Sequence, residues 1–280
     1  MRTPSQHKID WSNWREFAAP AVDSSKWTAI IPAAGRGSRL GSDRPKILYP
    51  VAGRPLIEWL LDFLEPNCSR LVFVLSPGGV AAVQPELERL IPARYEIVIQ
   101  EAPMGMGDAV ERALPAVGTP HCVIVWGDQV ALRRESVEAC LRLHEGPMHV
   151  SATCPTVFRA NPYIHFDRDA DGRICGLRQA REGDRMPDEG ESDTGFFCFE
   201  TQTLRRLLAG LHEQPGKEGR STGEFNFLPV IPFAARQGLE ILSPALMTLG
   251  ETVGINSAVD AHAVEAFLRN SHAGLDQHID

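Results

Sequence analysis

The sequence lacks the features that mark several classes of protein. No apolar run approaches the ~18 residues that a membrane-spanning helix needs, and the first residues do not pair a charged region with an apolar one as a signal peptide does. The six cysteines form no C-x-x-C pair, and the nine histidines show no close metal-binding spacing. We therefore expect no membrane span, no signal peptide, no zinc site, and a cytoplasmic protein with reduced thiols.

Positive charge is also scarce. Lysine and arginine number 28 against 36 acidic residues, which gives a net charge of −8. This balance argues against a general nucleic-acid or membrane-surface binder. The length of 280 residues and the apolar content of 43% suit one large α/β domain or two small ones.

Against this background, one stretch concentrates positive charge. An apolar strand at 27–33 runs into a glycine-rich loop, where Gly35 and Gly37 have no Cβ and can bring their amides close to phosphate oxygens. Arginine can bridge such oxygens bidentately, and lysine supplies a point charge. The loop therefore predicts a polyphosphate site with four cations, Arg36, Arg39, Arg44 and Lys46.

Several kinds of loop could carry this charge. A dinucleotide fingerprint fails because Leu40 stands where its third glycine belongs, and a P-loop fails because no Gly-Lys-Ser/Thr run exists. A solvated basic turn is the simplest alternative. The stretch instead matches G-x-G-[ST]-R-[LM]-x(n)-P-K-x-L-x-P-V-x-G-x-P. The matching positions are Gly35, Gly37, Ser38, Arg39, Leu40, Pro45, Lys46, Leu48, Pro50, Val51, Gly53 and Pro55.

This pattern resembles that of the sugar-nucleotide pyrophosphorylases, the nucleotidyltransferase family that makes activated sugars. The resemblance implies that the loop backbone and Arg36 hold the phosphates of a nucleoside triphosphate. It also implies catalytic roles for Arg39 and Lys46. The backbone positions concerned are Ala33, Ala34, Gly35 and Gly37.

The spacing of apolar residues predicts alternating strands and helices from Trp27 onward. Such alternation indicates a mainly parallel sheet covered on both faces, a Rossmann-like three-layer α/β/α fold that binds ligands beyond the carboxyl ends of its strands. Pro85 predicts a break in the second helix. The expected strands are 27–33, 71–76, 95–100, 122–126 and 149–154, and the expected helices are about 55–65, 78–91, 106–117 and 135–145.

The pattern changes after residue 155. Two short strands, 164–168 and 173–179, flank a turn and predict a small β-hairpin that belongs to the substrate region. The polar stretch 181–193 predicts a mobile loop. Beyond it we expect strands at 194–200, 239–242 and 251–255, and helices at 201–213, 223–237 and 257–269.

We expect one nucleotidyltransferase domain over 27–270, between an N-terminal extension (1–26) and a polar tail (271–280). The extension contains a short amphipathic helix that Asp10 can cap, with Trp11, Trp14 and Phe17 at helical spacing. Its apolar face is expected to dock on the domain, since amphipathic spacing mostly reports burial. A partner or oligomer contact is the alternative, and a homo-oligomer is compatible with the sequence.

Two further strand ends carry polar residues. Asp128 follows the strand 122–126, where a carboxylate suits a magnesium ion or, alternatively, caps the next turn. Gln100 ends another strand, and its amide can pair with a base edge. The backbone at Gly105 and Met106 then begins a helix, where free amides point outward. A plain strand–turn–helix connection is the alternative for this segment.

The resemblance extends to the N-acetylglucosamine-1-phosphate uridylyltransferases over residues 27–270. Their base-binding pattern, Q-x-x-x-x-G-T-G-x-A, is matched except that Met106 replaces threonine, which implies a base against Gln100, Gly105 and Met106. The resemblance also makes Asn256 the second Mg²⁺ ligand beside Asp128. The sugar-side matches are Tyr163, Asp193-Thr194-Gly195, Gly223-Glu224-Phe225 and Gly254-Ile255-Asn256.

The sugar side departs from the family pattern at three places. Asp193 replaces an asparagine, His165 falls in place of the arginine of Y-G-R, and Gln179 lies near the position of a sugar-binding glutamate. These changes imply a different sugar or an alcohol phosphate. No hexapeptide-repeat domain follows, so we expect no acetyltransferase activity. The expected substrate contacts are Tyr163, His165, Gln179, Asp193, Thr194 and Glu224.

The expected reaction is nucleotidyl transfer with Mg²⁺ as cofactor. A sugar-1-phosphate attacks the α-phosphorus of a nucleoside triphosphate, with UTP favoured, and pyrophosphate leaves. One alternative is a cytidylyltransferase that acts on a non-sugar phosphate or phosphonate. Another is a regulatory module that binds nucleotide-sugars without turnover.

Overall fold

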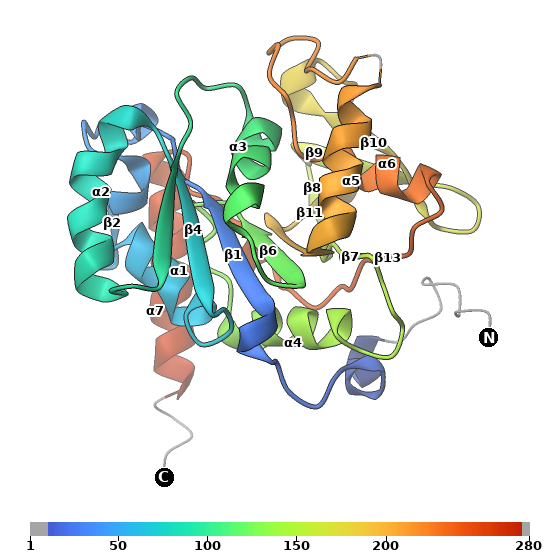
Figure 1. The fold of residues 1–280 in the computed structure, drawn as a ribbon, viewed down its shortest axis with the longest axis horizontal. Coiled ribbons are helices and arrows are strands. Elements are labelled where there is room, and N and C mark those ends of the chain that lie inside the picture. The colour runs from blue at the N-terminus through green and yellow to red at the C-terminus, as the bar shows by residue number, and fades with distance from the viewer. Residues whose placement is uncertain (1–10, 215, 276–280) are drawn as a thin grey trace.

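A seven-stranded mixed sheet forms the centre of the molecule (Figure 1). The computed structural model describes residues 11–214 and 216–275. The strand order is β13-β7-β12-β6-β1-β4-β5, and β6, β1, β4 and β5 run parallel, whereas β12 is antiparallel to both of its neighbours. The expected mainly parallel α/β sheet is confirmed. Its strands are β1 (Trp27–Pro32), β4 (Arg70–Leu75), β5 (Tyr95–Ile99), β6 (His121–Val125), β7 (Ala152–Thr153), β12 (Phe196–Glu200) and β13 (Ile241–Leu242).

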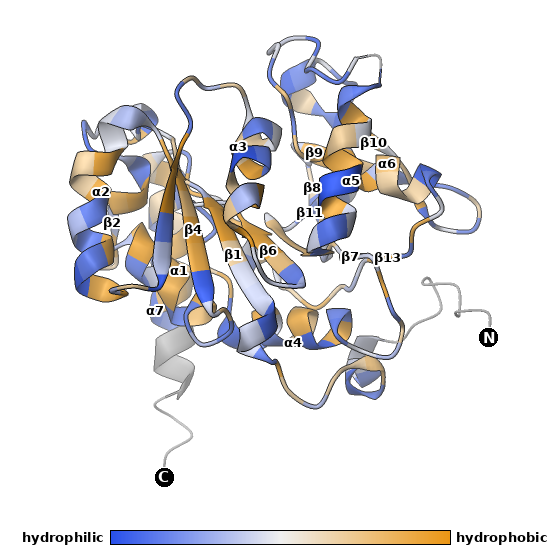
Figure 2. Cartoon of the chain, in the orientation of Figure 1, coloured by the Kyte–Doolittle hydropathy of each residue, from blue (hydrophilic) through white to orange (hydrophobic). Residues whose placement is uncertain are grey.

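Alternating side chains of β1 show why helices cover both faces. Ala29 and Ile31 enter one apolar core, Ile30 enters the other, and all three are fully buried. Figure 2 shows the apolar strands between helices whose outer surfaces are hydrophilic. The three-layer arrangement is therefore confirmed. The first face carries α1 (Leu56–Leu64), α2 (Pro77–Leu90), α4 (Arg134–His144) and α7 (Ala258–Leu275), and the second carries α3 (Met106–Ala113), α5 (Thr201–His212) and α6 (Val230–Arg236).

A smaller β region packs beside the sheet. The expected hairpin is present as β9 (Ile164–Arg168) and β10 (Ile174–Gln179). A second antiparallel pair, β8 (Thr156–Ala160) with β11 (Glu189–Asp193), lies next to it. The prediction of a mobile loop over 181–193 was wrong for its second half. The polar strand β11 is held there because buried Glu191 accepts hydrogen bonds from Arg168 and Thr156.

Several predicted element boundaries were also wrong. Pro85 does not break α2, because it lies on the exposed face, where water can solvate the carbonyl group that loses its partner. The expected strand 251–255 is instead a 3₁₀ turn, η8 (Leu249–Thr252), closed by a reciprocal capping box between Thr248 and Glu251. Of the predicted helix 223–237, only α6 forms. The predicted strand 149–154 is reduced to β7, and the loop after β1 ends in the short hairpin β2 (Pro50–Val51) and β3 (Arg54–Pro55).

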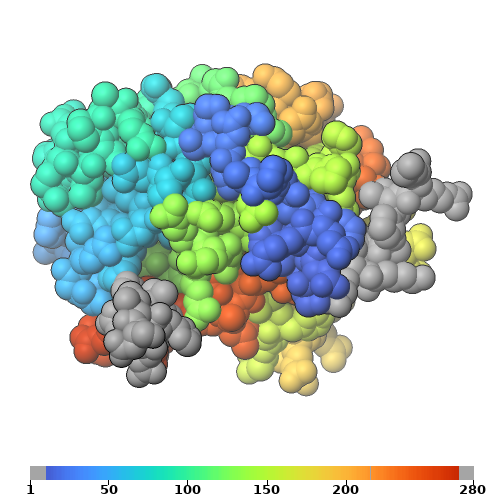
Figure 3. All heavy atoms as spheres, turned by 90° about the horizontal axis from the view of Figure 1, so that it is seen from below, coloured from blue at the N-terminus to red at the C-terminus, as the bar shows by residue number. Residues whose placement is uncertain are grey.

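The N-terminal segment packs against the main domain. Residues Trp11–Phe17 form a 3₁₀ helix, η2, where an α-helix was expected, and the proposed cap Asp10 lies outside the described residues. Trp11, Trp14 and Phe17 pack on an apolar cluster of α4, β13 and the segment before β7. Figure 3 shows this segment against the part of the chain that contains α4. The docking interpretation agrees with these contacts.

At the other end of the chain, α7 continues to Leu275, past the expected domain boundary at residue 270. Within residues 11–214 and 216–275, no helix is both long and apolar enough to cross a bilayer.

Candidate functional site

A cavity of about 700 Å³ opens where β1, β5 and β6 end, facing the smaller β region. This is the edge of a parallel sheet at which ligands bind. The lining comes from the loop after β1, from the segment after β5 with the segment before α6 that is bonded to it, and from β8, β10 and β11 of the smaller β region. Of the residues expected from the sequence, the cavity is lined by Ala33, Ala34, Gly35, Lys46, Gln100, Gly105, Met106, Asp128, Tyr163, Gln179, Asp193, Glu224 and Asn256.

Three side chains from distant parts of the chain meet at the centre of this cavity. The Nζ atom of Lys46 lies 2.5 Å from Oδ2 of Asp128 and 2.9 Å from Oδ1 of Asn256. The Lys46 and Asp128 side chains are each 19% exposed, so their ion pair is partly screened from water. The structure thus brings together the expected catalytic lysine and both expected metal ligands.

Backbone contacts hold the two oxygen ligands in place. Asp128 follows Gly127, whose amide donates to the carbonyl of Pro32, and a Cβ on Gly127 would lie 2.9 Å from that oxygen. Only glycine fits this close approach between the ends of β6 and β1. Asn256 precedes α7, and its backbone amide donates to Asp260 in the first turn of that helix. The strand end and the helix start therefore fix both side chains on rigid elements.

The donor set fits a hard divalent cation. Carboxylate and amide oxygens are ligands that magnesium accepts, and here two of them already surround one positive charge, the ammonium group of Lys46. Nowhere in the described chain do three or more His, Cys, Asp or Glu side chains gather as a metal site. Asp128 and Asn256 would therefore hold a metal ion that takes its other ligands from phosphate and water.

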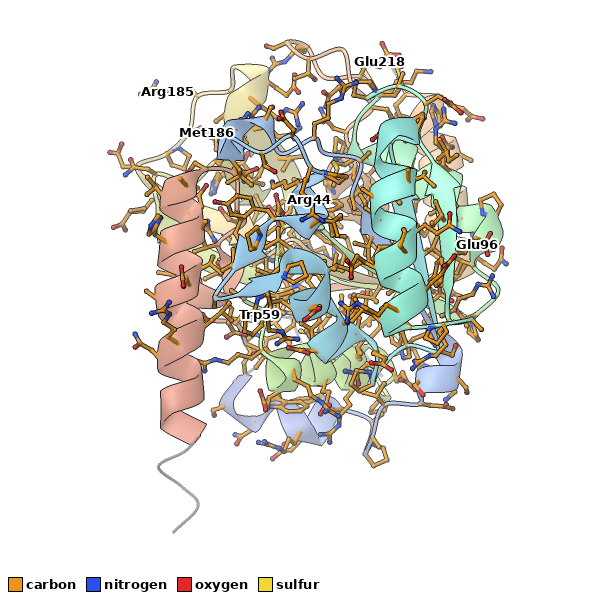
Figure 4. The ribbon with its side chains drawn as sticks, turned by 90° about the vertical axis from the view of Figure 1, so that its left-hand side faces the viewer. Arg44, Trp59, Glu96, Arg185, Met186 and Glu218 are labelled. Atoms are coloured by element: carbon orange, nitrogen blue, oxygen red, sulfur yellow. The ribbon has the colours of Figure 1, made fainter. Side chains whose placement is uncertain are left out.

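The arginines of the glycine-rich loop lie outside the cavity. Arg36, Arg39 and Arg44 are exposed, and none forms an ion pair with a carboxylate in the part of the chain that the structure describes. Figure 4 shows Arg44 on the same side of the molecule as Trp59 of α1. Gly37 likewise does not line the cavity. Of the four cations of this loop, only Lys46 reaches the centre, because the short turn Lys46–Leu48 directs the chain back into the core.

The segment after β5 presents Gln100 to the cavity in a fixed orientation. Nε2 of Gln100 donates to the carbonyl of Gly105 at 3.0 Å and to Asp108 at 2.8 Å. Both N–H groups are thus occupied, and the oxygen is the atom left to pair with a base. The φ angle of Gly105 is +106°, and its Cβ position lies 2.5 Å from the carbonyl oxygen of Phe225, so a side chain there would clash.

The lining from the smaller β region and from the segment before α6 is rich in charged and polar groups. Burial raises the pKa of the Asp193 carboxyl, although the backbone amide of Gly195 donates to it at 2.9 Å. Glu224 forms a 2.5 Å ion pair with Arg181. Gln179 is buried, whereas Tyr163 is 58% exposed at the mouth. Such a wall can hold a polar acceptor by several hydrogen bonds at once.

Two of the expected substrate contacts are not brought into the cavity. His165 accepts a hydrogen bond from the backbone amide of Glu191 through Nδ1, and its Nε2 lies 3.5 Å from Asp167. Its ring therefore supports the β8–β11 pair. Thr194 is fully buried, and its hydroxyl has no hydrogen-bond partner among the described residues.

Sequence reasoning missed several residues of the cavity lining, including two close to Asp128 and two arginines. Trp126 and Gln129 flank Asp128 in sequence, so their place at the same strand end was a usable signal. Arg159 and Arg181 gave no such signal. Arg159 lies on the unpredicted strand β8, and Arg181 lies in a segment that was expected to be a mobile loop.

The chain is similar to known proteins over most of its length. Residues 29–192 match the MobA-like NTP transferase domain family. The chain is 30% identical over 253 residues to the bifunctional protein GlmU of Desulfitobacterium hafniense strain Y51, covering 87% of this chain and 52% of that protein. It is 32% identical over 245 residues to GlmU of Cupriavidus pinatubonensis, covering 84% and 50%. The chain thus spans about half the length of these curated relatives.

A solved structure with a similar fold is the inositol-1-phosphate CTP transferase from T. maritima. Its TM-score is 0.66 at 17% identity, and the match covers 89% of this chain and 96% of that chain. At this identity the likeness concerns the fold alone. The family match covers more than half of the chain and includes the glycine-rich loop, Lys46 and Asp128. The chain therefore belongs to the MobA-like NTP transferase domain family and is a nucleotidyltransferase.

Proposed function

We propose that this enzyme transfers a nucleotidyl group, with UTP favoured, from a nucleoside triphosphate to a sugar-1-phosphate. The observation that carries the proposal is the meeting of Lys46, Asp128 and Asn256 at the centre of the cavity. The resemblance of the sugar-side motifs to those of N-acetylglucosamine-1-phosphate uridylyltransferases supports a sugar phosphate as acceptor. We place the reaction in the cytoplasm, which the six free cysteines favour.

The mechanism is an in-line displacement between two anions. An oxygen of the acceptor phosphate attacks the α-phosphorus, the bond from that phosphorus to the bridging oxygen breaks, and pyrophosphate leaves. Positioning and charge neutralisation would supply most of the rate enhancement, and no protein nucleophile is needed. In this proposal Lys46 neutralises the charge that gathers between the α-phosphate and the acceptor. Arg36 and Arg39 are free to fold over the β- and γ-phosphates.

Asp128 and Asn256 would hold Mg²⁺ beside Lys46. The bound ion would supply orientation and charge neutralisation at the α-phosphate. A metal ion bound there would repel the ammonium group of Lys46, so we expect Lys46 to move away from the two oxygens that it contacts in the free protein.

In this proposal, the side-chain oxygen of Gln100 recognises the base. Because Nε2 of Gln100 is occupied by Gly105 and Asp108, its oxygen would accept a hydrogen bond from the base. That acceptor suits the N3–H of uracil and the amino group of cytosine alike. A cytidylyltransferase is therefore the second candidate, and the fold of the T. maritima CTP transferase favours keeping it.

The test is pyrophosphate release with magnesium from UTP, CTP, dTTP, GTP and ATP, each paired with a panel of sugar-1-phosphates and alcohol phosphates. We expect release from one pair, abolished in Asp128→Asn and cut by about a hundredfold or more in Lys46→Ala. Near-normal turnover of Lys46→Ala would refute the assignment. Tight nucleotide-sugar binding with no release from any pair would instead favour a regulatory module without catalysis.

A further inference from the structure

Arg159 belongs to the acceptor wall, the name used here for the cavity lining formed by β8, β10, β11 and the segment before α6. No carboxylate of the described residues forms an ion pair with it. Arg159 lies on β8 opposite Gly190 of β11, and its side chain lines the cavity. Nη2 donates to the backbone carbonyl and to the hydroxyl of Thr252. These two contacts fix the guanidinium plane at the segment that leads to Asn256.

The charge of Arg159 is poorly compensated. In residues 11–214 and 216–275, no carboxylate forms an ion pair with it, and its Nε is buried without a hydrogen-bond partner. Burial lowers the pKa of Arg159, and the nearby charge of Asp193 opposes this only in part. A half-buried guanidinium that keeps spare donors is costly for the free protein. A bound anion would supply the missing counter-charge and hydrogen-bond acceptors.

Arg181, another arginine of the cavity lining, differs from Arg159 because carboxylates neutralise its charge. Glu224 neutralises it at 2.5 Å and Glu182 lies 3.7 Å away. Lys46, the cation at the centre, is likewise paired with Asp128. Arg159 is therefore the cation of the described cavity lining whose charge is left for a ligand.

We propose that Arg159 binds an oxyanion of the acceptor substrate and so selects acceptors by charge. This role rests on the proposed function for the identity of the acceptor wall. The planar guanidinium is suited to a phosphate or a carboxylate, which it can contact through two parallel N–H groups. The oxyanion is either the reacting phosphate or a second acidic group of the acceptor, as in a uronic acid phosphate.

The test is titration calorimetry of the full-length protein with inorganic phosphate, glucose 1-phosphate and glucuronic acid 1-phosphate. We expect wild-type protein to bind at least one of these probes, and Arg159→Gln to bind it about tenfold or more weakly. The affinity of Arg159→Lys should lie between those of wild type and Arg159→Gln, because lysine keeps the positive charge but loses the planar guanidinium that binds bidentately. The matched control is Arg185→Gln, since Arg185 is exposed at the outer edge of the molecule (Figure 4) and outside the cavity lining.

The pattern of losses identifies the source of the anion. An equal loss for both sugar phosphates assigns Arg159 to the reacting phosphate, whereas a loss confined to glucuronic acid 1-phosphate assigns it to a second acidic group. Equal binding of all probes by wild type and Arg159→Gln overturns the proposal, as does wild-type protein that binds no probe. If Arg159→Gln does not fold, Arg159→Lys carries the comparison. Binding that depends on Arg159 without any pyrophosphate release would refute the proposed function and leave only anion binding at Arg159 standing.

Discussion

At the scale of single residues, the ammonium group of Lys46 occupies the place where we propose that a metal ion binds. In the free protein its ammonium group contacts the carboxylate of Asp128 and the amide oxygen of Asn256. The same two oxygens are those that would hold a divalent ion. In the proposed mechanism, metal binding and release of the lysine would therefore be coupled. The released lysine could turn toward Gly35, whose carbonyl accepts a hydrogen bond from the Lys46 amide and where we expect the phosphates.

This coupling gives a prediction for Lys46→Met. Without the competing ammonium group, the nucleotide-free variant should bind Mn²⁺ about tenfold or more tightly than wild type, while its turnover falls. Electron paramagnetic resonance of free Mn²⁺ measures the affinity directly. The double variant Lys46→Met with Asp128→Asn serves as the control and should lose the gain. A variant that binds Mn²⁺ no better than wild type would contradict the coupling.

At the scale of elements, the start of α3 is joined to the segment before α6. The amide of Gly107 donates to the carbonyl of Phe225, and the amide of Phe225 donates to the carbonyl of Met104. This pairing brings the segment that we propose to bind the base and the residue Glu224 to one cavity. It depends on Gly105, whose backbone conformation and contacts leave no room for a side chain.

Gly105→Ala should therefore separate the two segments. The added methyl group meets the backbone of Phe225, and the positive φ adds strain of about 1–3 kcal/mol. We expect a lower melting temperature and a loss of nucleotide affinity, measured by thermal unfolding and by calorimetry. Gly118→Ala is the matched control, since no atom lies within 4 Å of its Cβ position. Unchanged nucleotide affinity in Gly105→Ala would contradict this role.

A second element junction, between β6 and α4, carries a pH dependence. Burial lowers the pKa of His144 to about 3, with the neighbouring His121 adding a smaller effect in the same direction. Its Nδ1 lies 3.2 Å from the hydroxyl of Thr153, and its ring packs edge-on against Trp27. The folded state therefore keeps this ring neutral at pH values where the unfolded chain protonates it.

The sign of the effect on stability follows from that difference. In the unfolded chain His144 has an ordinary pKa of about 6.5, so below that pH the unfolded state binds more protons than the folded state. As the pH is lowered from 6.5 toward 3, the free energy of unfolding should therefore fall by up to about 1.4 kcal/mol per pH unit. Urea unfolding between pH 7 and pH 4 measures the slope. His144→Gln should flatten it, whereas His262→Gln, at an exposed position on α7, should not. An unchanged slope in His144→Gln would count against this account.

At the scale of the whole molecule, the N-terminal segment packs against α4 and links the start of the chain to the main domain. Arg142 of α4 lies 5.0 Å from the centroid of the Trp14 ring, and its Nε donates to the carbonyl of Ala19 at 2.7 Å. The backbone amide of Ala19 also donates to the carbonyl of Arg142. These contacts lie at the opposite end of β6 from Asp128, so they stabilise the fold without touching the cavity.

Trp14→Ala should accordingly cost about 1–2 kcal/mol of stability and leave turnover unchanged, because the tryptophan is half-buried and distant from the cavity. Thermal unfolding and the pyrophosphate assay measure the two effects. Glu16→Gln, two residues away and exposed, is the control. A changed elution volume in gel filtration with an unchanged melting temperature would instead favour an oligomer contact.

The sequence was sufficient for the sheet and for the centre of the cavity, but not for the acceptor wall. Apolar strands such as β1 are recognisable by their composition. The glycine-rich motif identified Lys46, the end of a buried strand identified Asp128, and the family resemblance alone placed Asn256 with them. The strand β11 is polar and becomes buried only through long-range bonds to Glu191, so no local pattern predicts it. Arg159 was missed for the same reason, since its strand pairs only with β11.

The three central residues stand at positions 46, 128 and 256, and this order has a consequence during synthesis. Translation proceeds from the N-terminus at about 5–20 residues per second, so the 128 residues from Asp128 to Asn256 take roughly 6–26 seconds. A nascent chain can build the central strands and pair Lys46 with Asp128 in that interval. Asn256, the second oxygen ligand in our proposal, is synthesised only at the start of α7, so a nascent chain cannot complete the proposed site before residue 256 has been added.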